Sequence, residues 1–346
     1  MADFKDSQKN PGSNSQKTSG PNAQKNPGSN SQKTPGPSSQ KNPGSSETGE
    51  VKPEQPEPRR SLKTKFKASK FKKVITSPMG FLGFIIVLII ILLAIFAPLI
   101  APYDPLEINI AHMLEGSSSR FIMGTDNLGR DIFSRIIYGS RIALMVAIPA
   151  IIFGVIVGMF LGIISGYSTE RVDSFFIVLF DTMRSLPAII FAITVLAIIG
   201  PSMYILPIIM GITRVPIYGR LIRASTLRVK ENEYVTASRA LGGSSLSIMF
   251  KHILPNVIAP LFIQAAMDIP VMITFEAGLS FLGLGVPPPT PSWGHILRTG
   301  YLNVRQAPHI VIYGGIALIL ATLGFTLLGE TLRDVFDPKL QRRGNL

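Results

Sequence analysis

The sequence predicts an all-helical membrane protein with six transmembrane helices and a disordered N-terminal tail. Of its 346 residues, 46% are hydrophobic and only 16% are charged. Several apolar runs reach the length of about 20 residues that crosses the hydrocarbon core of a bilayer. The first 60 residues instead repeat a Gln-Lys pair among Pro, Gly, Ser and Asn. Such a composition cannot bury enough apolar surface to fold.

Residues 1–73 form the expected tail, which is repetitive, basic and cytoplasmic. They hold 15 Lys and Arg against 6 Asp and Glu, so most of the net charge of +13 is local to the tail. This distribution argues against a nucleic-acid partner. The tail lacks the apolar core and cleavage site of a signal peptide. The basic run at 63–73 binds anionic membrane lipid in one interpretation and only fixes orientation in the other.

The six expected spans are long stretches with few or no charged residues: 81–100, 142–167, 172–199, 203–222, 257–284 and 310–329. The third and fourth spans share the uncharged stretch 185–213, which could also form one long span. A turn signal at Gly200-Pro201-Ser202 favours two spans. Asp181 and Arg184 then lie near or within the membrane.

The distribution of basic residues supports six spans with both termini in the cytoplasm of a multi-pass cell-membrane protein. Five spans would turn the seven Lys and Arg of residues 214–251 outward, against the positive-inside rule. The expected organisation is therefore the tail, a first helix with an external loop (74–137), a core of five helices (138–330) and a cytoplasmic C-terminal tail (331–346).

The stretch 233–256 interrupts the apolar half of the chain between the fourth and fifth spans. Its first part, 233–241, is a good helix former, and Ala237, Ser238 and Ala240 keep the helix surface thin. A thin helix lets another backbone approach closely.

A second short helix is expected after a glycine break in the same stretch. Gly242 ends the first helix, and Ser244 or Ser245 can cap the second. Leu254-Pro255 is expected to end the second helix where the next span starts. The resulting unit is a helix, a turn and a helix, and the alternative is a plain cytoplasmic linker.

This stretch resembles the cytoplasmic loop of ABC importer permeases, whose consensus begins Glu-Ala-Ala. Thr236, Ala237 and Ser238 stand at the first three consensus positions, followed by Gly242 and Leu254-Pro255. The sequence departs from the consensus where the glutamate is absent and where His252 replaces the usual Ile.

Two further segments carry the resemblance, "FIMGTDNLGRDIFSRIIYGSRIAL" at 121–144 and "FEAGLSFLGLGVPPPTPSWGHIL" at 275–297. They are similar to signature segments of the oligopeptide, dipeptide and nickel permease subfamily, in particular the second permease of the pair. The resemblance implies the type I importer fold and three kinds of partner: a second homologous permease, two ABC ATPases and an external substrate-binding protein. The tail has no counterpart in the family.

The resemblance also implies that the 233–256 loop couples the spans to an ATPase, with force passing through Leu254-Pro255. The residues it assigns to coupling are Glu233, Thr236, Ala237, Ser238, Ala240, Leu241, Gly242, Leu254 and Pro255. The expected cargo is an oligopeptide or dipeptide, and nickel is the alternative. These segments do not separate the two, because specificity in the family lies largely in the binding protein.

The sequence gives no support to an enzyme. It contains no phosphate-binding loop, so ATP is expected to be used by partner subunits and no cofactor is expected in this chain. Cysteine is absent, and the four histidines show no paired metal-ligand spacing. We find no nucleophile, base and orienting acid in a plausible pattern.

The rival functional classes are an ion-coupled secondary transporter and a membrane scaffold. Asp268 and Glu276 lie eight residues apart on the fifth span and so share nearly one helical face. These two acids, with Arg184, are the candidate translocation-path residues. The family segment includes Glu276 but not Asp268.

The external side offers Asp126, Arg130 and Trp293 as candidates for docking the binding protein. Residues 102–140 are too charged to span and long enough to fold against a partner. Trp293 follows a proline-rich turn and suits the membrane interface. The alternative is structural, because Asp126 and Arg130 at a spacing of four could simply stabilise a surface helix.

Overall fold

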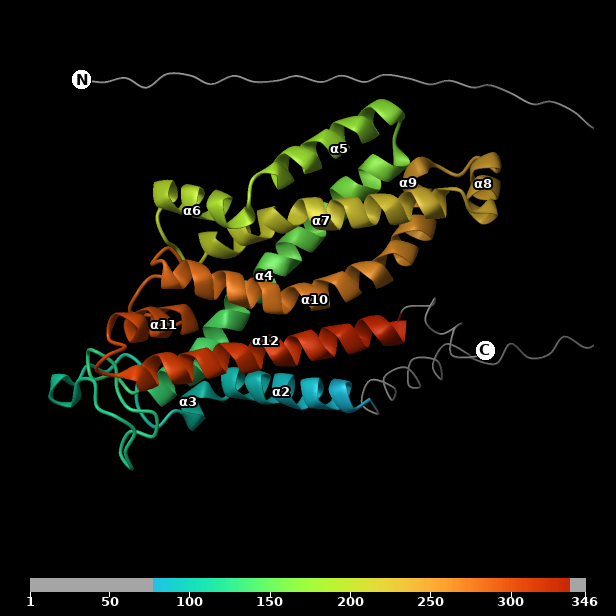
Figure 1. The fold of residues 1–346 in the computed structure, drawn as a ribbon. Coiled ribbons are helices and arrows are strands. Elements are labelled where there is room, and N and C mark those ends of the chain that lie inside the picture. Colours follow the sequence, from blue (N-terminus) through green and yellow to red (C-terminus); the bar gives the residue numbers. More distant parts are fainter. Residues whose placement is uncertain (1–76, 337–346) are drawn as a thin grey trace, which may run out of the picture. The chain divides into compact units, whose positions relative to one another are not determined.

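The computed structural model describes residues 77–336, which contain helices, turns, loops and one isolated bridge between Thr125 and Asp131. The predicted tail, 1–73, lies outside the described residues, as does the end of the C-terminal tail. Five described helices are long and apolar enough to cross a membrane (Figure 1): Pro78–Ile95 (α2), Ile132–Tyr167 (α4), Ile205–Lys230 (α7), Leu254–Phe281 (α10) and Pro308–Phe336 (α12). The prediction of an all-helical membrane protein is confirmed.

Shorter helices connect these five. They are Ala97–Ile100 (α3), Ile110–His112 (η1), Glu170–Ser185 (α5), Ala188–Ile199 (α6), Glu233–Ala240 (α8), Ser245–Ile248 (α9), Met249–Ile253 (η2) and Trp293–Leu302 (α11). The expected first span, 81–100, is divided at Phe96 between α2 and α3. Pro98 lies in the first turn of α3, where the missing amide of a proline is tolerated.

The expected third span, 172–199, is not one continuous helix. Helices α5 and α6 form a pair bent by 79°, and a sixth crossing exists only if this pair counts as one span. The break lies at Leu186, which has extended backbone angles. A proline disfavours the helical conformation of the residue before it, and Pro187 follows directly. The predicted turn after this segment is confirmed, since α6 ends before Gly200.

The tightest helix pair joins α4 to α7 along glycines spaced four residues apart on α4. They are Gly154, Gly158, Gly162 and Gly166. A Cβ atom added at Gly158 would lie 2.6 Å from the Tyr218 Cβ, and one at Gly162 would lie 2.5 Å from the Gly219 carbonyl oxygen. No side chain fits at these positions, so the two backbones approach as closely as small residues allow in membrane helices.

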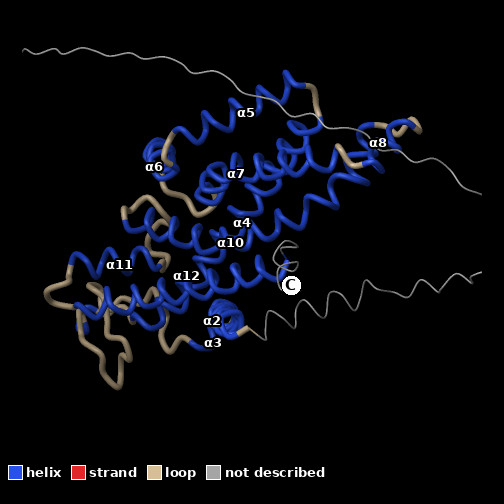
Figure 2. Tube along the Cα trace, turned by 45° about the vertical axis from the view of Figure 1, so that its right-hand side comes forward, coloured by secondary structure: helices blue, strands red, loops and turns tan. Residues whose placement is uncertain are grey.

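Helices α2, α12 and α10 lie side by side next to this pair (Figures 1 and 2). Helices α8 and α9 lie at one end of the bundle, where α4 and α7 finish. Helix α11 and the loop that holds η1 lie at the opposite end (Figure 1). The bundle therefore separates two candidate sites, a helical loop at one end and a folded loop at the other.

Candidate ATPase-coupling site

The connection between α7 and α10 projects from the end of the bundle as two short helices (Figure 1). Val235, Ile248 and Ile253 belong to this connection and are buried, so they form its small apolar core. Leu241 lies at the tip with 88% of its surface exposed, and Leu246 is also exposed. An apolar residue held outward on a packed base is available for contact with another protein.

Helix α8 ends in a Schellman motif at the predicted glycine. Gly242 has a φ of +80°, as the sequence predicted. The Gly242 amide donates to the Arg239 carbonyl and the Gly243 amide donates to the Ser238 carbonyl, each at 3.0 Å. These two bonds satisfy carbonyls that the helix end leaves free. A left-handed residue disfavours any side chain, so the direction of the turn depends on Gly242.

Ser244 caps α9, which confirms one of the two predicted caps: its Oγ accepts from the Ser247 amide at 3.3 Å. The prediction that Leu254-Pro255 ends this helix is wrong. The chain stays helical from α9 through the π-helical turn η2 into α10. The wider turn, closed by the Leu254 amide donating to the Met249 carbonyl, lies directly before Pro255 and accommodates its missing amide.

The side chain of Tyr167, the last residue of α4, joins the loop to the spans. Lys230 at the end of α7 places its Nζ 5.7 Å from the centre of the Tyr167 ring, and Arg239 of α8 places its guanidinium carbon 5.6 Å from it. Lys230 also donates to the Tyr167 carbonyl at 3.2 Å. Cation–π contacts therefore connect three helices at one ring.

Tyr234 makes a second connection, between α8 and the start of α10. Its hydroxyl accepts from the Asn232 and Asn256 side-chain amides, each at 3.3 Å. Its ring centre lies 5.8 Å from that of His252, the residue that departs from the family pattern. The loop is thus fastened to the helices on both sides of it.

Most of the predicted coupling residues share one property, which is exposure at this end of the bundle. The exposed members are Glu233, Thr236, Ala237, Ala240, Leu241, Gly242 and Pro255. Ser238 is half-buried, because its carbonyl closes the Schellman turn, and Leu254 is half-buried at the start of α10. The structure gathers the exposed residues on a surface and leaves their coupling role a prediction.

Asp268, a candidate for the translocation path, is only 4% exposed and lies between helices. Arg214 of α7 approaches it with 3.7 Å between Nη1 and Oδ1, and Gln264 donates to the same oxygen at 3.5 Å. This chain therefore holds Asp268 in an ion pair between α7 and α10.

The other two path candidates lie apart from Asp268. Glu276 is 1% exposed, and its Oε1 accepts from the Ser280 hydroxyl at 2.6 Å. Arg184 is exposed near the end of α5. The structure does not bring the three side chains together, and their role in transport stays a prediction.

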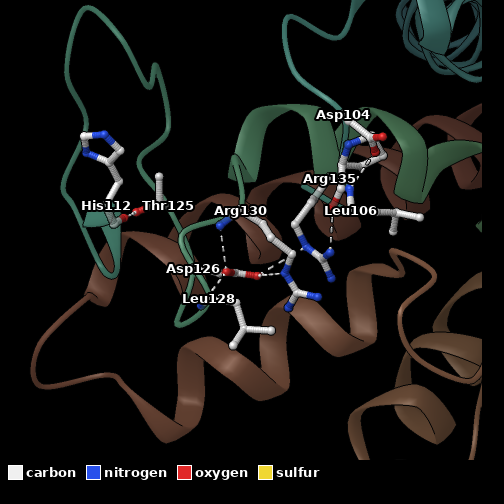
Figure 3. Close-up of polar contacts among 9 residues, drawn as sticks. Asp104, Leu106, His112, Thr125, Asp126, Leu128, Arg130 and Arg135 are labelled. Atoms are coloured by element: carbon white, nitrogen blue, oxygen red, sulfur yellow. Dashed lines mark hydrogen bonds and ion pairs between the residues drawn. The ribbon is translucent and has the colours of Figure 1, made fainter. Parts of the chain in front are cut away.

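The loop that holds η1 contains an ion cluster around Asp126 (Figure 3). The carboxylate of Asp126 accepts from the Arg130 side chain at 2.7 Å and from the Leu128 and Arg130 amides at 2.8 and 3.0 Å. The Nε of Arg135 lies 3.5 Å from it. The predicted pair of Asp126 and Arg130 exists, but it closes a turn before α4 and is not on a helix.

Trp293, the third docking candidate, is only 3% exposed and is packed inside the protein. Its indole N–H donates to the Ile136 carbonyl at 3.0 Å. A Cβ added at Gly139 would lie 2.6 Å from the indole, so the ring packs directly on the α4 backbone. Asp126 and Trp293 are thus buried in structural contacts, and docking by this region stays a prediction.

Residues 154–342 match the model of a family described as "binding-protein-dependent transport system inner membrane component". The match includes α7, the projecting loop and α10. The chain belongs to this family. Residues 71–116 also match the N-terminal transmembrane domain of oligopeptide transport permease C.

Similar proteins carry names from peptide transport. A dipeptide transport system permease protein of Alkalihalophilus pseudofirmus is 40% identical over 78% of this chain and 89% of the relative. A di/tripeptide transport system permease of Pseudomonas aeruginosa is 39% identical over 75% of this chain and 88% of its own length. A glutathione transport system permease of Pectobacterium atrosepticum is 38% identical over 74% and 85%.

Several structurally important residues of the permease were not found from the sequence. Arg214 pairs with Asp268, and Arg223 of α7 donates twice at 2.5 Å to Asp173 of α5. Tyr167 was treated only as the end of a span. A charged residue at the polar end of an apolar run gives only a weak indication of an ion pair, because its partner lies about 50 positions away in the sequence.

Proposed function

We propose that this permease is one of two related permeases in an ABC importer of short peptides. The names of the relatives, which refer to dipeptides, di/tripeptides and glutathione, support a peptide cargo. Two ABC ATPases would supply the energy, and an external binding protein would deliver the substrate. The α8–α9 loop would dock in a groove of one ATPase.

The observation that carries the proposal is the build of the loop. Leu241 is an exposed tip, while Val235 and Ile248 form a buried base. The Schellman turn and the two tyrosine connections restrict the loop relative to the spans. A loop that only joined two helices would need neither the fixed turn nor a connection to α4.

The basic residues support a cytoplasmic position for this end of the permease. Arg220, Arg223, Arg228 and Lys230 lie on the last turns of α7, and Arg239 and Lys251 follow in the loop. Lys and Arg accumulate on the cytoplasmic side of membrane proteins. In this orientation α11 and the Asp126 cluster face outward, toward the binding protein.

The ion-coupled alternative is weakened by the position of its main residue. A carboxyl group that carries protons must exchange its charge during transport, whereas Asp268 lies against the permanent charge of Arg214. Membership in a binding-protein-dependent family also supports ATP as the energy source.

The test is reconstitution of the permease with its second permease, both ATPases and the binding protein in vesicles. We expect ATP-dependent uptake of a labelled dipeptide and none of labelled nickel. Leu241→Glu should reduce ATPase co-purification by about tenfold, which corresponds to about 1.4 kcal/mol. Leu302→Glu is the matched control, because Leu302 is an exposed leucine on α11 at the other end. ATPase co-purification unchanged by Leu241→Glu would contradict the docking role.

A further inference from the structure

A basic pocket lies between the end of α4, the start of α5 and the α8–α9 loop. Its volume is about 600 Å3, and its polar lining consists of Tyr167, Ser168, Thr169, Lys230, Arg239 and Ser245. The proposed docking of an ATPase uses only the outer surface of the loop. The inner wall, which faces this pocket, has no assigned role.

The two cations of the basic pocket are not neutralised by the protein. Among the described residues, no carboxylate forms an ion pair with Lys230 or Arg239. The nearby carboxylate of Asp173 is held by two bonds from Arg223 and one from Ser165. The basic pocket therefore keeps a positive charge suited to an anion.

The cations also have donors to spare. The ammonium of Lys230 has three hydrogens, and its bonds to the Gly166 and Tyr167 carbonyls, at 3.5 and 3.2 Å, use two of them. Arg239 has five donors, and the ring face of Tyr167 occupies only one side of its guanidinium. A phosphate oxygen can accept from both side chains, with the Ser168 and Ser245 hydroxyls close by.

An apolar groove begins where the basic pocket ends. Its lining residues are all apolar and include Phe160, Ile163, Ile164, Met249 and Phe250. Ile164 and Met249 line both the pocket and the groove. Phe160 lies two turns before Tyr167 on α4, so the groove runs about 10 Å deeper along the span.

We propose that the basic pocket and the groove together bind one anionic phospholipid. The phosphate lies between Lys230 and Arg239, and an acyl chain follows Phe160 and Ile164 into the membrane. A basic pocket between spans at the cytoplasmic surface suits such a head group. The positive charge of the basic pocket would also attract a soluble phosphate. The apolar groove of Phe160 and Phe250 favours a ligand that carries a hydrocarbon tail as well.

The lipid would contact α4, α5 and both helices of the loop, α8 and α9, at once. A bound phosphate would therefore hold Arg239, and with it α8, against the end of α4. This consequence for coupling rests on the proposed function, whereas lipid binding itself requires only a membrane protein with this pocket.

The test is native mass spectrometry of the full-length permease, purified without ATPases and titrated with phosphatidylglycerol or phosphatidylcholine of equal chain length. We expect phosphatidylglycerol to bind at least about fivefold more tightly, or about 1 kcal/mol. Lys230→Gln with Arg239→Gln should remove this preference. Arg228→Gln with Lys251→Gln is the matched control, because both side chains are exposed cations of the same region and neither lines the pocket.

Two further sets of measurements test where the lipid binds and whether the variants are misfolded. Phe160→Ala with Phe250→Ala should weaken phosphatidylglycerol binding, and glycerol phosphate, the soluble probe, should not compete. The single variant Arg239→Gln should weaken phosphatidylglycerol binding, and Arg239→Lys should retain it. Equal binding of both lipids, full competition by glycerol phosphate or an equal loss in the control pair would overturn the proposal. ATPase docking enters none of these measurements, so failure of the proposed function would be seen separately.

Discussion

Arg214 of α7 and Asp268 of α10 face each other with 3.7 Å between Nη1 and Oδ1, in a part of the bundle where both are largely withdrawn from the surface. Asp268 Oδ2 and Arg214 Nε have no hydrogen-bond partner among the described residues. Gln264 gives Asp268 a further contact only at 3.5 Å, so each charge depends mainly on the other.

The first prediction is that the single substitutions Asp268→Asn and Arg214→Gln each destabilise the permease by about 3 to 5 kcal/mol, since each leaves one buried charge unpaired. The double variant should recover most of this loss. Thermal unfolding in detergent, together with the yield from membranes, measures the difference. Strictly additive losses in the double variant would show that the pair does not interact.

The second prediction concerns Gly242. Gly242→Ala should cost about 1 kcal/mol in the local turn, because φ is positive there although a Cβ would meet no atom. We expect impaired co-purification of the ATPases with normal insertion. Gly278→Ala in α10 is the control, since a Cβ there also meets no atom and the backbone is helical. Similar behaviour of both variants would rule out a special role for the turn.

The third prediction separates the ring of Tyr167 from its hydroxyl. Tyr167→Phe should retain the contacts with Lys230 and Arg239, whereas Tyr167→Leu should lose two cation–π contacts of about 0.5 to 1 kcal/mol each. Trypsin cleavage after Arg239 should then accelerate about fivefold or more in the Leu variant, because the population of the opened loop rises exponentially with the lost free energy. If the Phe and Leu variants were cleaved at the same rate, and faster than the wild type, the connection would depend on the hydroxyl and not on the ring.

The fourth prediction is a pH dependence at the end of the bundle that holds α11. Burial, together with the nearby arginines Arg135, Arg298 and Arg130, lowers the pKa of His295 in the folded permease despite a backbone hydrogen bond at Thr290. The unfolded chain therefore binds the proton first as the pH falls below about 6.5. Stability should be complete above this pH and decrease below it. His295→Gln should flatten the decrease between neutral and mildly acidic pH, and an unchanged slope would contradict the assignment.

Much of the fold follows from features that are local in the sequence. Uncharged runs of sufficient length predicted the spanning helices, and the break at Gly200 was correct. Gly242 and Ser244 also behaved as predicted, because a left-handed helix end and an N-cap depend on a few neighbouring residues.

The features that were not predicted depend on distant parts of the chain or on a single proline. The Trp293 ring, for example, packs on Gly139, more than 150 positions earlier. Pro187 breaks a segment whose apolar composition suits one straight span. Pro255 does the opposite, because a π-helical turn absorbs it without ending the helix.

That uninterrupted path has a mechanical result. Residues Ser245–Phe281 form one continuous 37-residue helical path of about 55 Å, although Pro260 and Pro270 each remove one helical hydrogen bond, so α9 runs without a break into α10. The other side of the loop is different, because Glu231 and Asn232 leave a joint between α7 and α8. A push or twist applied to the loop therefore reaches α10 through continuous helix, whereas it reaches α7 through this joint and through the Tyr167 ring that Lys230 and Arg239 share.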